Sequence, residues 1–287
     1  GGGLPRGVDS VTKFGACNDS MYMKSLGLIT VTLACATAFS VDAQRSAVKP
    51  VLRLRGGDTM STLTKVGAGL FATAGALTYV APKTNLEMYG VPAASIDYTA
   101  LAYMRGTGIW QFTVAVILLL DPSKVNSVAL LVAAGACLLI TAQLEPVQQP
   151  KGPLVAWTLV LAGLGTFAVQ TGSVSPWVSG ALYLANGLQF HFFPKRTSEM
   201  YKVGVPVSEL GYAMFTLHGG AMLVSAVYLG CLAAGLSQPQ AFAAAFVVNG
   251  ALAAKYSITD ADKVGASKTG PLGWTAISAV LAGLALK

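Results

Sequence analysis

The stretch Pro82-Lys83-Thr84-Asn85-Leu86-Glu87-Met88-Tyr89 occurs a second time, as Pro194-Lys195-Arg196-Thr197-Ser198-Glu199-Met200-Tyr201. The two octapeptides share the pattern Pro-Lys-x-x-x-Glu-Met-Tyr, and a Gly-Val-Pro follows each of them, at residues 90–92 and 204–206. An apolar run precedes each copy and another follows it. Because self-similarity at a fixed order indicates a repeated structural unit, we predict that most of the chain is one membrane-embedded unit present twice.

The composition indicates that lipid is the solvent. Of the 287 residues, 54% are apolar and 11% are charged, and the mean hydropathy is +0.60. Soluble domains carry about 25% charged residues, so a soluble surface of this size could not be covered. The net charge of +7 forms no clustered basic face of the kind that nucleic acid requires. We therefore expect the lipid bilayer as a partner and no nucleic acid.

The apolar runs predict the fold class. They lack the alternation of a barrel strand, and backbone groups in lipid must be satisfied within helices or closed barrels. The predicted fold is therefore all-α, a polytopic membrane helix bundle with about eight transmembrane helices. The eight runs are residues 63–80, 96–120, 128–144, 154–169, 178–193, 210–234, 241–256 and 272–286.

The runs form two groups of four, which predicts one four-helix membrane repeat over residues 59–172 and a second over 173–287. Because four spans is an even number, both repeats start on the same side and run parallel, with a pseudo-two-fold axis along the membrane normal. Lysine and arginine gather on the side of the repeated Pro-Lys loops. By the charge rule for loops, these loops are predicted to face the stroma, with both termini on the opposite side.

The N-terminal region is interpreted as a targeting sequence. Residues 1–20 are small and polar and are interpreted as an upstream or non-native segment, and residues 21–58 as a signal plus transit presequence. Residues 26–33 are an apolar core too short to span a bilayer, small residues follow at 34–38, and the stretch to residue 57 is rich in Ser and Arg. The junction Ala38-Phe39 resembles that of bipartite presequences in algae with complex plastids, which implies a plastid membrane, thylakoid or envelope. An ordinary signal peptide with a basic linker remains the alternative.

Arg105 and His218 are the candidate ligand-binding residues. A cation within a span is costly and usually faces protein or water. Aligned by the glycines that follow them, Gly106 and Gly219, the two residues occupy the same position in their copies. This predicts a pair of polar groups near the interface between the copies, contacting an anionic or quinone-like ligand. Alternatively, the Arg105 side chain reaches toward the interface or pairs with a loop carboxylate, and His218 bonds a neighbouring carbonyl.

The other polar residues have structural interpretations. In the repeated loop, Glu87 and Glu199 pair with the lysines four residues earlier if the loop is helical. Asp97 and Glu209 suit the N-terminal ends of two helices. Aromatic residues that fit interfacial belts are Tyr89, Tyr201, Trp157, Trp177 and Trp274. Residues expected to form hydrogen bonds between helices are Asn186, Gln189, His191 and Asn249.

No phosphate-binding or dinucleotide glycine motif, di-metal pair or Ser-His-Asp set is visible. We therefore expect no cofactor, no metal site and no catalytic residues. Whether the chain is an enzyme stays open, and the lack of a catalytic set favours a non-enzymatic role.

The order of an apolar helix, the segment Pro82 to Pro92 with its Tyr-Gly-Val-Pro, and a helix carrying Arg105-Gly106 resembles the small four-helix DoxX-like membrane proteins. The likeness covers most of the first copy. The second copy departs from it, with His218 in place of the arginine and Lys202-Val203 inserted before Gly204. The resemblance implies a fold rather than an activity. The functional hypotheses are an accessory or assembly factor of a photosynthetic or other plastid membrane complex, a small-solute or ion carrier, and a quinone-linked redox accessory.

Overall fold

The computed structural model describes residues 56–287, with side chains from Met60 onward. The segment 1–20 and nearly all of the presequence predicted for residues 21–58 lie outside the described residues. The first described helix begins at Gly56, so it includes the last three residues of that predicted presequence.

The described part of the chain consists of ten α-helices and three short 3-10 turns, which confirms the all-α prediction. Eight helices are long, and each coincides with one apolar run. They are α2 (Gly56–Val80), α4 (Tyr98–Leu119), α5 (Val125–Thr141), α6 (Gly152–Thr171), α7 (Trp177–Phe192), α9 (Glu209–Ala233), α10 (Gln238–Thr259) and α11 (Thr269–Ala285). The short elements are α3 (Pro82–Met88), α8 (Pro194–Met200), η1 (Ala93–Ser95), η2 (Glu145–Val147) and η3 (Asp262–Val264).

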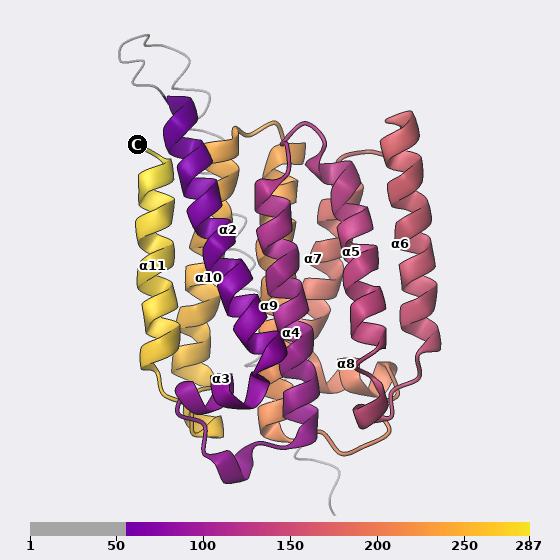
Figure 1. Cartoon of the computed structure of the whole chain (residues 1–287), viewed down its shortest axis with the longest axis vertical. Helices are drawn as coiled ribbons and strands as arrows, with labels where there is room; N and C mark the ends of the chain where they lie inside the picture. The colour runs from indigo at the N-terminus through magenta and orange to yellow at the C-terminus, as the bar shows by residue number, and fades with distance from the viewer. Residues whose placement is uncertain (1–55) are drawn as a thin grey trace, which may run out of the picture. The chain divides into compact units, whose positions relative to one another are not determined.

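The repeated octapeptides form the short helices α3 and α8. Each begins with its proline at the first helical position, where the missing N–H costs no hydrogen bond. Figure 1 places both at the same end of the bundle, opposite the C-terminus. Helices α2, α4, α5 and α6 are here called the first half, and helices α7, α9, α10 and α11 the second half. The two halves therefore run in the same direction. Each half begins and ends at the end of the bundle opposite its repeated motif.

The two halves interlock rather than stand side by side. Helices α4 and α9 pack on each other at the centre, where the Thr107 hydroxyl reaches the Met214 carbonyl at 3.2 Å. The first helix of each half packs on the third helix of the other half. Phe71 of α2 meets Phe246 of α10, with ring centroids 5.8 Å apart, and Tyr183 of α7 donates to the Ala129 carbonyl of α5 at 3.1 Å.

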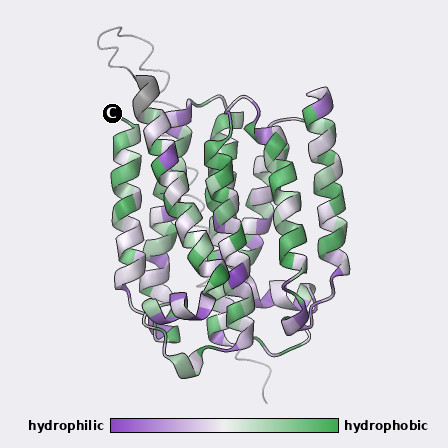
Figure 2. Cartoon of the chain, in the orientation of Figure 1, coloured by the Kyte–Doolittle hydropathy of each residue, from purple (hydrophilic) through white to green (hydrophobic). Residues whose placement is uncertain are grey.

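The outer surface is apolar between charged ends. Figure 2 shows hydrophobic residues along the helices and hydrophilic ones in the connections beside α3 and α8. Helices α6, α9 and α10 are each long and apolar enough to cross a membrane. Exposed apolar patches of this extent mark a surface that something apolar covers. On the outermost helices α6 and α11 the exposed residues include Val155, Leu159, Val160, Phe167, Leu272, Ile277, Val280 and Leu284.

Candidate ligand-binding site

The helix caps show which residues of the two halves correspond. Asp97 caps α4 by accepting from the Ala100 N–H at 2.8 Å, and Ser208 caps α9 by accepting from the Gly211 N–H at 2.9 Å. Asp97 therefore corresponds to Ser208, and Glu209 is the first residue inside its helix. Both carboxylates lie at the N-terminal ends of their helices, as predicted.

Close glycine contacts give the same register. A side chain on Gly108 would lie 2.7 Å from the Gly75 carbonyl, and one on Gly219 would lie 2.7 Å from the Gly187 carbonyl. These glycines let the second helix of each half approach the first, so Gly108 corresponds to Gly219. His218 then corresponds to Thr107 and not to Arg105, and the predicted equivalence of Arg105 and His218 was wrong.

The ends of the two repeated helices show a further correspondence. The N–H of Gly90 bonds the Glu87 carbonyl at 2.9 Å, and the N–H of Lys202 bonds the Glu199 carbonyl at 3.0 Å. Both residues have a left-handed backbone, with φ of 78° and 52°. Lys202 therefore takes the position of Gly90, and Lys202-Val203 is no insertion. The alignment of Gly106 with Gly219 is therefore two residues away from the register that pairs Gly108 with Gly219.

Two cavities flank the central α4–α9 pair. The first, named here the His218 cavity, has a volume of about 80 Å³ and lies among α4, α5, α6, α7 and α9. The second, the His191 cavity, has a volume of about 170 Å³ and lies among α2, α3, α4, α7, α9, α10 and α11. A cavity needs about 10–15 Å³ of such volume to hold one water molecule, so both cavities are larger than a single water requires.

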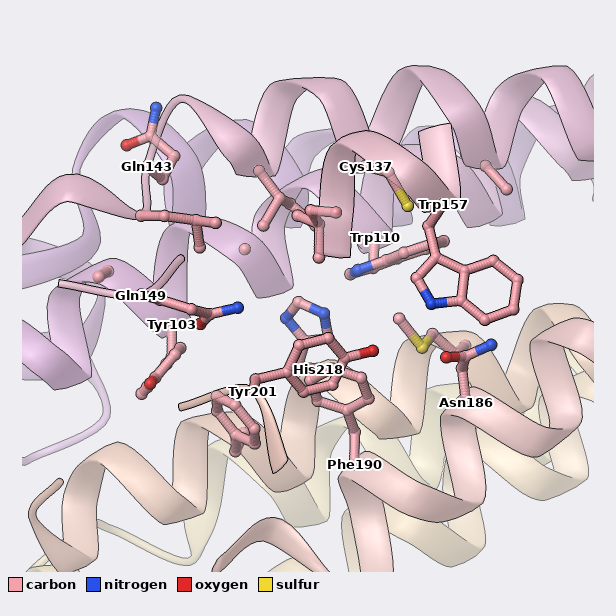
Figure 3. Close-up of a pocket in the computed structure, with 18 of the residues that line it drawn as sticks. Tyr103, Trp110, Cys137, Gln143, Gln149, Trp157, Asn186, Phe190, Tyr201 and His218 are labelled. Carbon is pink, nitrogen blue, oxygen red and sulfur yellow. The ribbon is translucent and has the colours of Figure 1, made fainter. Parts of the chain in front are cut away.

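Aromatic rings build the wall of the His218 cavity. The imidazole of His218 stacks on Phe190, with ring centroids 4.9 Å apart, and meets Trp110 edge-on at 5.9 Å. Figure 3 shows His218 at the centre, with Phe190 and Tyr201 on one side and Trp110 and Trp157 on the other. Such a wall fits a flat ring, which can stack on the aromatic faces.

Three buried polar atoms on this wall lack a hydrogen-bond partner within the described residues. They are Tyr103 Oη, Trp110 Nε1 and His218 Nδ1. Leaving such a group unpaired costs about 1–3 kcal/mol each, so a native structure with three at one cavity needs an explanation. The indole N–H only donates, and a tyrosine hydroxyl can donate. Together they suit a ligand that carries acceptor oxygens.

Gly106 keeps the space beside His218 open. A side chain at this position would lie 2.9 Å from Nδ1 of His218. Real Cβ atoms do not approach so closely, and the His218 ring is already held against Phe190. The glycine therefore leaves the edge of the imidazole that carries Nδ1 free of side chain from α4.

Arg105 lines neither cavity. It is half-buried and shares a helix face with the exposed residues Phe112 and Val116, seven and eleven positions further on. It forms no ion pair with any side chain that the structure describes. This geometry matches the alternative in which the Arg105 side chain extends toward the interface at the α3 end.

The residues of the repeated motif divide between the two cavities. Tyr201 lines the His218 cavity and Tyr89 lines the His191 cavity. The predicted pair of Lys83 and Glu87 is present, at 3.9 Å. Lys195 instead pairs with Glu209, at 3.1 Å, and Glu199 is exposed.

Most of the aromatic residues predicted for interfacial belts face the cavities. Trp157 lines the His218 cavity, and Trp274 lines the His191 cavity, where its indole N–H donates to the Tyr89 hydroxyl at 3.2 Å. Trp177 is exposed. Four of the five predicted belt residues therefore have a second explanation as residues that line a cavity, and Trp177 does not.

The predicted interhelical hydrogen bonds are present in part. Asn249 donates to the Ser278 hydroxyl of α11 at 2.9 Å, and His191 Nδ1 lies 2.8 Å from the Thr216 carbonyl of α9. Asn186 bonds the Leu182 carbonyl of its own helix instead, and Gln189 reaches Met200 Sδ at 3.7 Å.

Sequence reasoning missed Tyr103 and Trp110. A signal was available, because Trp110 lies in the middle of an apolar run and not at its end. Belt residues sit at the membrane interfaces, so a mid-run indole needs a buried partner or a ligand.

Among residues 60–287, no group of three His, Cys, Asp or Glu side chains could hold a metal ion. The chain matches no protein-family description, no curated protein and no solved structure.

Proposed function

We propose that this chain is an integral membrane protein whose His218 cavity binds the ring of a quinone-type compound. The observation that carries the proposal is the presence of three unpaired buried polar atoms on residues that line one mainly apolar and aromatic cavity, namely Tyr103, Trp110 and His218. Ligand sites commonly combine apolar walls with a few converging polar groups.

The chemistry of a quinone complements this wall. Its flat ring can pack against the aromatic side chains that line this cavity, and its carbonyl oxygens can accept hydrogen bonds from the Trp110 indole N–H and the Tyr103 hydroxyl. His218 Nδ1 provides a third hydrogen-bonding atom on the same wall. The apolar tail of a membrane quinone suits the lipid that would surround such a protein.

The bilayer assignment extends to all eight long helices. Three of them are long and apolar enough by themselves, and the exposed apolar faces of α6 and α11 support the same environment for the others. We propose that the α3 and α8 end lies on the stromal side of a plastid membrane, on the basis of its lysines and the predicted presequence. The role we assign is a non-enzymatic, quinone-linked accessory of a plastid membrane complex.

Intrinsic tryptophan fluorescence tests ligand binding. Replacing Trp177 and Trp274 by Phe leaves Trp110 and Trp157, which both line the His218 cavity. Titration of the detergent-solubilised protein with a decyl-benzoquinone should quench this fluorescence saturably. Decylbenzene, which lacks the carbonyl oxygens, serves as the matched ligand.

The Tyr103→Phe variant removes one donor and keeps the ring. Since a hydrogen bond contributes about 1 kcal/mol, the variant should bind the quinone about five- to tenfold more weakly. A matched control is Tyr98→Phe, an exposed residue at the start of the same helix, which should leave the affinity unchanged. Quenching that is linear and equal for both ligands would reject the proposal.

A further inference from the structure

The His191 cavity is a second site with its own chemistry. It lies on the opposite side of α4 and α9 from the His218 cavity and shares no lining residue with it. The remaining two buried polar atoms that lack a partner among the described residues, Gln111 Oε1 and His191 Nε2, both belong to its wall.

The hydrogen bond to Thr216 fixes the state of His191. Its Nδ1 lies 2.8 Å from the Thr216 carbonyl, and a carbonyl oxygen can only accept. Nδ1 therefore carries the proton, and Nε2 of the neutral ring offers a lone pair. His191 is buried, with 4% of its surface exposed, so water outside the protein does not reach this lone pair.

Four other polar side chains of this wall have hydrogen-bond partners. Asn85 donates to the Thr78 hydroxyl at 2.8 Å, Thr107 donates to backbone carbonyls, and Asn249 donates to Ser278. Trp274 donates to Tyr89. The two unpaired atoms, Nε2 of His191 and Oε1 of Gln111, are both acceptors, whereas the His218 cavity presents the donors Trp110 and Tyr103.

We propose that the His191 cavity binds a lipophilic phenol, whose hydroxyl group donates a hydrogen bond to Nε2 of His191. The aromatic residues Phe71, Tyr89, Tyr256 and Trp274 supply an apolar wall for its ring. The cavity is about 170 Å³, against about 80 Å³ for the His218 cavity, which leaves room for substituents on the ring. The two sites thus discriminate ligands by the direction of the hydrogen bond.

The chain offers a reporter for each site. Of its four tryptophans, Trp274 is the one that lines the His191 cavity. A protein with Trp110, Trp157 and Trp177 replaced by Phe therefore reports this cavity alone. It is titrated with a brominated alkylphenol, whose bromine quenches indole fluorescence, and with the O-methyl ether of the same compound.

The phenol should quench Trp274 saturably, and the ether, which cannot donate, should bind about tenfold more weakly. His191→Phe should reduce the affinity for the phenol to that for the ether and leave the ether unaffected. Gln189→Leu, a polar residue on the same helix that lines neither cavity, is the matched control.

Equal, non-saturating quenching by phenol and ether indicates partition into detergent and overturns the proposal. If His191→Phe does not fold, the comparison of the phenol and the ether in the protein with Trp274 alone still tests whether the ligand donates a hydrogen bond in this cavity. Because the quinone titration reads Trp110 and Trp157 instead, the two sites can succeed or fail separately.

Discussion

At the scale of single residues, Gly106 controls the space beside His218. Gly106→Ala would put a Cβ atom 2.9 Å from His218 Nδ1, so the imidazole must turn away from the cavity or α4 must shift. We expect quinone affinity to fall at least tenfold, with helix content unchanged in circular dichroism. Gly163→Ala, at a position with open space on α6, should bind like the wild type. Unchanged affinity in Gly106→Ala would show that His218 Nδ1 takes no part in binding.

Asp260 should make stability depend on pH. Its carboxylate is 3.1 Å from Lys255 Nζ and 3.3 Å from Lys263 Nζ. Burial opposes ionisation, but the charge of Lys255 and the hydrogen bonds outweigh it and hold the pKa of Asp260 below its ordinary value. A lowered folded-state pKa gives stability that is present above the unfolded-state pKa and is lost as the pH falls through the folded-state value.

The measurement is thermal unfolding in detergent at several pH values. Asp260→Asn should lower stability by about 1 kcal/mol at pH 7, and the difference from the wild type should vanish as Asp260 becomes protonated in acid. Asp121→Asn is a control for an exposed carboxylate that makes only local contacts. A difference that persists unchanged in acid would assign the effect to something other than this ion pair.

At the scale of helices, the register of α9 on α7 depends on Gly219. A Cβ atom there would collide with the backbone of His191 and with the Gly187 carbonyl, and neither can move without moving the helix. Gly219→Ala should therefore destabilise the protein by about 1–3 kcal/mol or more. Gly230→Ala, in the same helix with open space, should be neutral or slightly stabilising because alanine favours helices. Equal stability of the two variants would contradict the register.

The long helices were predictable because apolar runs of this length have no other stable form in lipid. The helical form of the repeated motif was foreseen only as a condition for the pairing of Lys83 with Glu87. The correspondence between α4 and α9 was not predictable. Lys202 adopts the left-handed conformation that Gly90 adopts, and a lysine in the sequence does not indicate that conformation. The alignment of Gly106 with Gly219 was two residues out of register.

The site was predictable only in part. His218 was selected because it is polar within an apolar run, and it lies at the His218 cavity. Arg105 met the same criterion but lies on the outer face of α4, since the sequence does not reveal which face of a helix meets its neighbours. Tyr103 and Trp110 were missed because aromatic residues count as apolar in a run, although each carries a polar atom.

At the scale of the whole molecule, the parallel halves predict a topology. α3 and α8 lie at one end of the bundle, and the connection between α4 and α5 lies at the other (Figure 1). In a cysteine-free background, Lys83→Cys and Lys195→Cys should react with an impermeant thiol reagent from the same side of sealed vesicles. Lys124→Cys should react only from the opposite side. Labelling of Lys83→Cys and Lys195→Cys from different sides would contradict membrane insertion in this arrangement.

The accessory role predicts an assembly. On native gels of detergent-solubilised plastid membranes, the protein should migrate with a larger complex that uses quinone. Migration alone, as a monomer or dimer, would remove the accessory role while leaving ligand binding intact, and would favour a carrier.

Photolabelling tests whether a quinone binds in the His218 cavity. The membrane-embedded protein is irradiated with an azido-benzoquinone and the adducts are mapped by mass spectrometry. We predict adducts on the residues that line the cavity from separate helices, such as Cys137, Trp157 and Phe190, and competition by unlabelled decyl-benzoquinone. Adducts confined to the exposed apolar faces of α6 and α11, with no competition, would contradict the account.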